Sequence, residues 1–210
     1  SLKSRNIQRV SSIKKGDTTE NWYINKYPVT VSTGDIIKYD ITIANEGNLD
    51  GYATKITDYL ADGLELVSKD ELVKLKIINQ NDEYYGWVKE NSSNLYTPVS
   101  TTYLSDKKIK AYNQGSDTVD TKVVHIYCKV TSSIAGRLLN NVAEITEEKA
   151  TNSAGQQVTD RDSTPGNIKT LDLSYRWKGN SGNKDIEKTD IKEQYVLGVY
   201  FTHFLIYLTY

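Results

Sequence analysis

The chain has 210 residues and almost balanced charge, with 26 Lys and Arg against 27 Asp and Glu. Proteins that bind the nucleic-acid backbone normally show a basic surplus, so this balance argues against a nucleic-acid partner. Sixteen Tyr and three Trp favour strands, because aromatic side chains fit a half-buried pleated surface. The single cysteine, Cys128, excludes a disulfide framework within the chain. The composition predicts a globular, β-rich domain.

Alternation of apolar and polar residues, the pattern of a strand with one buried face, recurs along the chain. Turn residues such as Gly34-Asp35 and Asp62-Gly63 separate the alternating segments, and we expect Gly63 to need a positive φ. Short strands at this spacing indicate an antiparallel sandwich or barrel. In chain order, strands are predicted at residues 7–13, 36–45, 52–59, 64–67, 83–88, 101–104, 121–130 and 139–146.

Two strands have a clear predicted buried face. It consists of Ile37, Tyr39, Ile41, Ile43, Val124, Ile126, Cys128 and Val130. Lys38, Asp40 and His125 alternate with these positions and are expected to point outward. His125 and Cys128 therefore point to opposite sides of the sheet, which argues against a Cys–His catalytic pair.

The regions outside these strands complete the predicted organisation. A short helix is expected near residues 68–78, with Ser68 as N-cap and Glu71 three residues later. Residues 1–25 should supply an N-terminal strand and lead-in, and residues 168–194 a polar linker. Residues 195–210 form an apolar tail whose status is open: a partial membrane anchor, an added edge strand or an unpaired end. At 16 residues the tail is short for a membrane span, which needs about 20, so we expect it outside the core.

Several motifs in order resemble one protein family. They are Gly34-Asp35, Asn45-Glu46-Gly47, Thr57-Asp58, Ala61-Asp62-Gly63-Leu64, Asn141-Val142-Ala143 and the segment Asp160-Arg161-Asp162-Ser163-Thr164-Pro165-Gly166-Asn167. This order resembles the conserved-repeat, immunoglobulin-like domain of bacterial cell-surface proteins, of the clostridial, Gram-positive type, a domain of unknown function. The resemblance covers about residues 26–167, with Ala61 where the family has proline.

The resemblance implies an immunoglobulin-like antiparallel β-sandwich. It also implies a non-catalytic structural or adhesive module of an extracellular, wall- or surface-associated protein. Its partners would be neighbouring modules of the same polypeptide, with host or cell-wall glycans and proteins as further candidates. The alternative is a carbohydrate-binding module of a secreted glycan-processing protein.

Enzyme signatures are missing from the sequence: there is no Gly-rich phosphate loop, no His-Glu-x-x-His and no Gly-x-Ser-x-Gly. We therefore expect no catalytic activity and no cofactor. In related pilin-type sandwiches a buried lysine forms an isopeptide bond with a buried asparagine, helped by an acid. Asn141 suits the acceptor role, with Asp58 or Glu144 as the acid. The donor lysine is the weak point, because residues 7–13 contain none, Lys3 and Lys14 only flank them, and Lys38 points outward. We expect no bond.

Two further candidate sites come from residue type alone. Asp160, Asp162 and Asn167 supply oxygen ligands of the kind calcium prefers, although a plain polar turn explains them equally well. The second is an aromatic ligand platform, because exposed aromatic side chains serve as contact anchors. Its residues would be Tyr84, Tyr85, Trp87, Tyr96 and Tyr103.

Overall fold

In the part of the chain that the structure describes, the fold is mostly antiparallel β-sheet with one short helix, as the all-β prediction requires. It was obtained as a computed structural model. The structure describes residues 9–15, 18–24, 31–45, 47–91, 96–112, 119–131, 138–139, 141–159, 186–188, 198–199 and 203–208.

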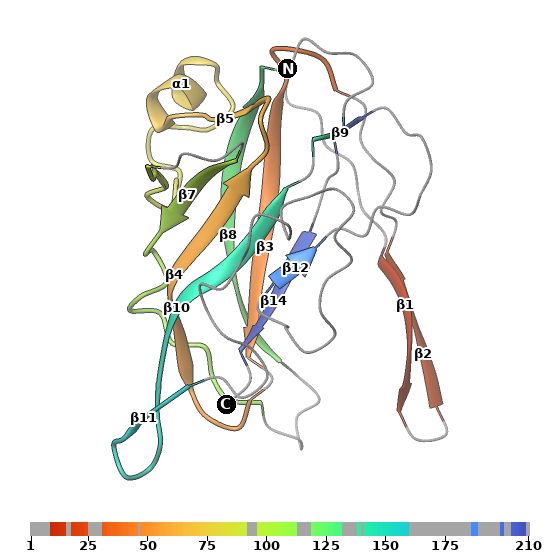
Figure 1. Cartoon of the computed structure of the whole chain (residues 1–210), viewed down its shortest axis with the longest axis vertical. Coiled ribbons are helices and arrows are strands. Elements are labelled where there is room, and N and C mark those ends of the chain that lie inside the picture. Colours follow the sequence, from red (N-terminus) through yellow and green to blue (C-terminus); the bar gives the residue numbers. More distant parts are fainter. Residues whose placement is uncertain are drawn as a thin grey trace.

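Two sheets contain most of the described strand residues (Figure 1). The first, called the β3–β8 sheet, has the order β14 (His203–Leu208), β3 (Ile36–Asn45), β8 (Asp120–Val130) and β5 (Leu64–Leu66). The second, called the β4–β10 sheet, has the order β11 (Gln157–Val158), β10 (Val142–Thr151), β4 (Gly51–Leu60), β7 (Thr97–Thr101) and β6 (Val88–Lys89). β12 (Ile186–Lys188) also pairs with β10.

The predicted buried faces of the two long strands are confirmed. β3 and β8 are antiparallel neighbours, and their register pairs Ile37 with Cys128 and Tyr39 with Ile126. Every residue of the predicted inward set is buried, and most are completely inaccessible to solvent. Lys38, by contrast, is half-buried on the outer face. The alternation therefore gave the correct face of both strands.

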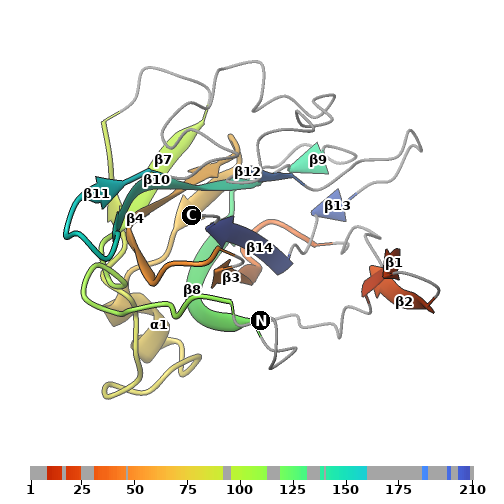
Figure 2. The ribbon, with the colours of Figure 1, turned by 90° about the horizontal axis from the view of Figure 1, so that it is seen from below.

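A single apolar core joins the two sheets. Ile41 and Val124 of the β3–β8 sheet belong to the same buried cluster as Ile56, Val99 and Ile145 of the β4–β10 sheet. Figure 2, seen from below, shows the two sheets as separate layers, with β3 and β8 on one side and β4, β7 and β10 on the other. Burying a side chain of this size stabilises a fold by about 1.5–3 kcal/mol, so the shared core holds the layers together.

The helix is shorter than predicted. α1 spans Lys69–Lys74, and its N-cap Ser68 accepts a hydrogen bond from the backbone of Glu71 at 3.2 Å, as expected. It ends early because Lys76 adopts a left-handed φ of 57°. The backbone of Ile77 then donates to Leu72, and that of Lys76 to Val73, which closes the last turn.

Two predicted strands are wrong. Residues 83–88 contain a turn instead, because Tyr85 and Gly86 both have positive φ, and only Val88–Lys89 form β6. The strand predicted at 101–104 lies earlier, as β7 (Thr97–Thr101), and a turn follows it. β7 ends at Thr101 because the Thr101 hydroxyl accepts a hydrogen bond from the backbone N–H of Tyr103 at 3.1 Å, within the turn. Gly63 has the expected positive φ.

The closing strand of the predicted set is divided and extended. Leu138–Leu139 form β9, which pairs in parallel with β13 (Gly198–Val199). β10 begins at Val142 and continues to Thr151, five residues beyond the predicted end. Register shifts between Ile145 and Glu148 accommodate its bend along β4. The polar residues 147–149 are therefore part of the sheet.

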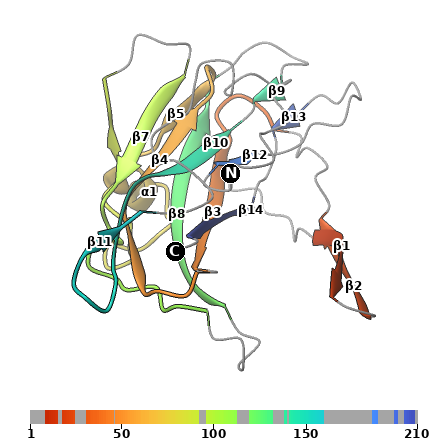
Figure 3. The ribbon, with the colours of Figure 1, turned by 60° about the horizontal axis from the view of Figure 1, so that its bottom comes forward.

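The segments at both chain ends differ from the expectations. β1 (Arg9–Lys15) and β2 (Thr18–Ile24) form an antiparallel hairpin, and among the described strands they pair only with each other. The hairpin stands apart from the two sheets in Figures 1 and 3, so residues 9–13 of the predicted first strand belong to neither sheet. At the other end, β14 pairs in parallel with β3, from His203 opposite Asp40 onward. Of the three alternatives for the tail, the structure shows the added edge strand.

Candidate functional site

An acid and an amide meet in the core, as the proposed cross-link site requires. Asp58 lies on β4, opposite Ala143, and Asn141 directly precedes β10. Nδ2 of Asn141 donates a hydrogen bond to Oδ2 of Asp58 at 2.8 Å, and both residues are completely inaccessible to solvent. The alternation explains this placement, because Asp58 shares the inward face of β4 with Ile56 and Leu60.

Burial controls the charge of this pair. It raises the pKa of the Asp58 carboxyl to about 8, although the hydrogen bond from Asn141 partly opposes the shift. Asp58 is therefore mostly protonated at neutral pH. Burial also raises the pKa values of Tyr39 and Cys128, and interactions with Asp58 add to both shifts. The core thus contains a neutral polar cluster between the two sheets.

The pair is not fully satisfied. Among the described residues, neither Oδ1 of Asp58 nor Oδ1 of Asn141 has a hydrogen-bond partner. A buried polar atom without a partner costs about 1–3 kcal/mol. A protonated carboxyl beside an amide can polarise it toward attack by an amine.

No lysine completes that chemistry among the residues whose side chains are described. Lys38 lies on the outer face, where its Nζ contacts Oδ1 of Asp40 at 3.0 Å. Lys14 belongs to the β1–β2 hairpin, and Lys3 lies outside the described residues. The arrangement therefore provides an acceptor and an acid, and the donor is the missing part.

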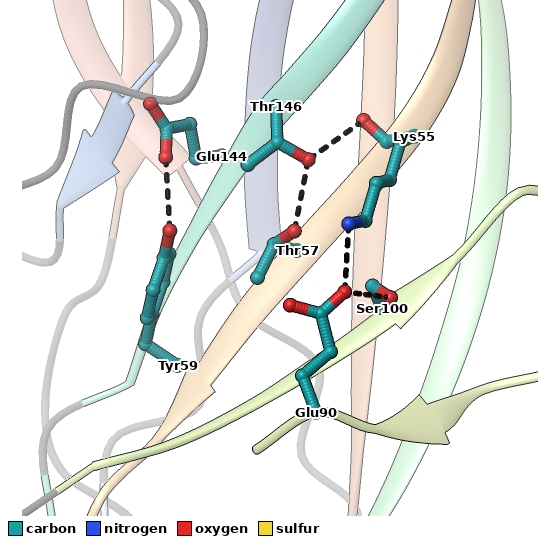
Figure 4. A network of polar contacts seen from close by, with 7 residues as sticks. All are labelled: Lys55, Thr57, Tyr59, Glu90, Ser100, Glu144 and Thr146. Atoms are coloured by element: carbon teal, nitrogen blue, oxygen red, sulfur yellow. Dashed lines mark hydrogen bonds and ion pairs between the residues drawn. The ribbon is translucent and has the colours of Figure 1, made fainter. Parts of the chain in front are cut away.

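Glu144, the alternative acid, belongs to a different network. It is also buried, but the hydroxyl of Tyr59 donates to its Oε2 at 3.2 Å on the face opposite Asp58. Figure 4 shows this face of the β4–β10 sheet. There, Thr57 and Thr146 hydroxyls lie 2.8 Å apart and link β4 to β10. Glu144 thus stabilises the strand pair and does not contact the Asn141 amide in this arrangement.

A second link on that face involves Glu90. Its Oε1 lies 2.7 Å from Nζ of Lys55 and accepts a hydrogen bond of 2.7 Å from the Ser100 hydroxyl (Figure 4). These contacts lower the pKa of Glu90. They connect Glu90, which follows β6 at the edge of the sheet, to Ser100 of β7 and Lys55 of β4.

The predicted aromatic platform is divided between core and surface. Trp87 is 4% exposed and its indole Nε1 donates to the backbone oxygen of His125 at 2.7 Å. The Tyr84 hydroxyl donates to the backbone oxygen of Val67 at 2.5 Å. Both side chains therefore hold the loop before β6 against the β3–β8 sheet. Tyr85, Tyr96 and Tyr103 are half-buried at the edge of the core.

Sequence reasoning missed one polar pair on the outer face of β3 and β8. Asp40 and His125 are directly opposite in register, and His125 Nδ1 lies 2.6 Å from Asp40 Oδ1. Contacts with His125 and Lys38 lower the pKa of Asp40 to about 2, against an opposing effect of burial, which is the largest single contribution. The alternation indicated that both side chains point outward, but not that they are neighbours.

The predicted calcium ligands Asp160, Asp162 and Asn167 lie outside the described residues, so this site stays a prediction. Within the described part of the chain, no group of three or more His, Cys, Asp or Glu side chains is placed to hold a metal ion. In the same residues, no helix is long and apolar enough to cross a membrane.

Comparisons found no matching family model, curated protein or solved structure.

Proposed function

We propose that this chain is an immunoglobulin-like structural module of a bacterial cell-surface protein, and that it acts as a non-catalytic spacer. The ordered motifs between Gly34 and Asn167 support this proposal. So does the topology: the consecutive strands β3 and β4 lie in different sheets, and β8 returns beside β3. Such crossings between sheets are typical of sandwiches of this class.

The observation on which the proposal depends is the path of the chain through the two sheets. β3 begins at the end of the core where Gly34 donates to the backbone oxygen of Val130 at 2.8 Å. β10 ends near the other end, where Ala150 is opposite Gly51. At about 3.3 Å per residue, the ten residues of β3 separate these ends by about 30 Å. The chain therefore enters and leaves this part of the fold at opposite ends (Figure 1).

This path suits a module that spaces its neighbours and bears tension. Force applied along the strands loads the β3–β8 ladder in shear, so many backbone hydrogen bonds must break together. The register pairs every residue of β3 with β8. Force that separates strands from one end would instead break the bonds one after another. The fold should therefore resist tension along its long axis best.

Single-molecule pulling of the full chain in two geometries tests this. Attachment through S32C and A154C loads opposite ends, and attachment through N48C and A154C loads the same end. All three positions are exposed. Cys128 does not compete for attachment, because it is buried and its pKa is raised. We expect a several-fold higher unfolding force for the opposite-end pair. An equal or lower force would overturn the spacer proposal.

A further inference from the structure

The turn between α1 and β6 holds an aromatic residue in an unusual conformation. Tyr85 has a φ of 64°, in the left-handed region, and Gly86 follows with a φ of 61°. For a bulky residue such a φ is an outlier, and it persists only where its surroundings impose it. Asparagine or glycine would adopt this backbone more easily, so the tyrosine ring needs another explanation.

The surroundings restrain Tyr85 from several sides. Oε1 of Glu83 accepts hydrogen bonds from the backbone of Tyr84 at 3.1 Å and of Tyr85 at 3.2 Å. The Thr101 hydroxyl donates to the backbone oxygen of Tyr85. Trp87, two residues later, is anchored in the core. The turn is thus fixed by its neighbours, and the Tyr85 ring remains half-exposed at the edge of the core.

The Tyr85 ring meets the outer face of the β3–β8 sheet. It lies edge-to-face with His125, at 5.3 Å between ring centroids, and with Tyr103 at 4.8 Å. Asp40 adjoins His125, and both side chains are open to solvent, at 38% and 26% exposure. Two strands and two loops therefore bring two tyrosines, an imidazole and a carboxylate to one surface.

Two polar atoms at this surface retain bonding capacity. The Lys38 and His125 contacts both reach Oδ1 of Asp40, and among the described residues Oδ2 has no partner. His125 uses Nδ1 toward Asp40, and its Nε2 likewise bonds to no described residue. A ring nitrogen of an imidazole can take part in a hydrogen bond. The surface therefore offers a carboxylate oxygen and an imidazole nitrogen beside two aromatic rings.

We propose that Tyr85, Tyr103, Asp40 and His125 form a binding site for a neutral saccharide. The Tyr85 ring contacts the C–H face of a sugar, Tyr103 flanks it edge-on, and Asp40 and His125 form hydrogen bonds with its hydroxyl groups. Fixed aromatic rings with a few placed polar atoms are the usual composition of a small-ligand site. This site replaces the platform expected from sequence, because Trp87 is buried and His125 and Asp40 are added.

The local charges favour a neutral ligand over a charged one. Asp40 would repel an anion, while Lys38 adjoins that carboxylate and Nζ of Lys107 lies 3.9 Å from the centre of the Tyr103 ring. The lysines therefore already occupy the positions that a cationic ligand would take. Hydroxyl groups can pair with Asp40 and His125 without adding a charge. The proposal does not depend on the mechanical role, which a separate experiment tests.

The test is calorimetric and NMR titration of the full chain with tri-N-acetylchitotriose, cellotriose and maltotriose. The key variant is Tyr85→Asn, which removes the ring and suits the left-handed backbone, so the fold should be retained. His125→Gln is a second variant at a half-exposed position that leaves Tyr85 in place. Val88→Ser is the matched control, because Val88 is 59% exposed and lies just beyond the turn.

We expect saturable binding of at least one trisaccharide at millimolar or lower concentration. Tyr85→Asn and His125→Gln should each weaken it at least tenfold, without lowering the melting temperature in the Tyr85 variant, and Val88→Ser should leave it unchanged. Absence of binding at millimolar concentrations of all three sugars would overturn the proposal. So would binding that survives both Tyr85→Asn and His125→Gln.

Discussion

Two aspartates on consecutive strands show how strongly the face of a sheet decides the chemistry of a side chain. Asp40 lies on the outer face of β3, beside Lys38 and His125, and its pKa is lowered to about 2. Asp58 lies on the inner face of β4 with an amide as its hydrogen-bond partner, and burial raises its pKa to about 8. At neutral pH one is an ionised acceptor and the other is mostly a neutral acid.

The difference follows from what each carboxyl exchanges for water. Asp40 keeps part of its hydration and gains contacts with His125 and the ammonium group of Lys38, which favour the charged form. Asp58 loses its hydration and gains only a neutral amide, so the charged form becomes costly. Loss of the proton from Asp58 on the inner face therefore destabilises the fold.

The largest effect should appear as a pH dependence of stability. Because the pKa of Asp58 is raised from its ordinary value of 3.8 to about 8, the folded state binds a proton that the unfolded state releases between these values. The free energy of unfolding should then fall as pH rises from about 4 to about 8, by on the order of 5 kcal/mol at about 1.4 kcal/mol per unit. Urea unfolding of the wild type and Asp58→Asn at a series of pH values measures the difference. Parallel curves would contradict the prediction.

Removing the amide partner should have the next largest effect. Asn141→Ala leaves the Asp58 carboxyl without a described partner and opens a small cavity, so we expect the free energy of unfolding to fall by about 2–4 kcal/mol. Urea unfolding below pH 6 isolates this effect, because Asp58 is then protonated. Its matched control is Asn48→Ala, at an exposed position. A loss no greater than in the control would show that the pair contributes little.

The outer aspartate should matter much less. Its lowered pKa means that Asp40 contributes stability above its ordinary value of 3.8, and that this contribution is lost as pH falls toward about 2. Because the group is half-exposed, solvent screens its ion pairs, and Asp40→Asn should cost less than about 1 kcal/mol at pH 7. Thermal unfolding at pH 7 and pH 3 measures this. A larger loss at pH 3 than at pH 7 would reverse the expected sign.

The last prediction is that the covalent mass of the chain does not change. An isopeptide bond at Asn141 would release ammonia and lower the mass by about 17 Da, as required when an amine displaces an amide nitrogen. We expect the full chain to have its unmodified mass, because no described lysine contacts Asn141. Intact-protein mass spectrometry decides this. A deficit that disappears in Asn141→Ala would establish the bond and locate its acceptor.

The sequence predicts well where alternation and local caps decide the structure. The inward faces of β3 and β8 follow from period two, and Ser68 caps α1 because its hydroxyl reaches the backbone of Glu71. The inward positions of Asp58 and Asn141 also follow from alternation, because Asp58 lies within β4 and Asn141 directly precedes β10. In each case the information lies within a few residues of the feature.

The sequence fails where distant or backbone effects decide. Residues 83–88 are rich in aromatics, which favours a strand, but Tyr85 and Gly86 turn the chain through left-handed conformations. The Asp40–His125 pair depends on the register between strands far apart in sequence, and alternation does not specify that register. The N-terminal hairpin likewise depends on which strand β1 selects as a partner.

The parallel pairing of β14 with β3 has a consequence for the order of folding. Its partners, such as His203 and Asp40, are about 160 residues apart in the sequence. Contacts of such separation form slowly, and during synthesis β14 emerges long after β3. Until it arrives, the outer edge of β3 presents unpaired backbone groups to any strand nearby. A second copy at high concentration could supply the same strand first, so exchange of β14 between copies is the expected route to dimers of this protein.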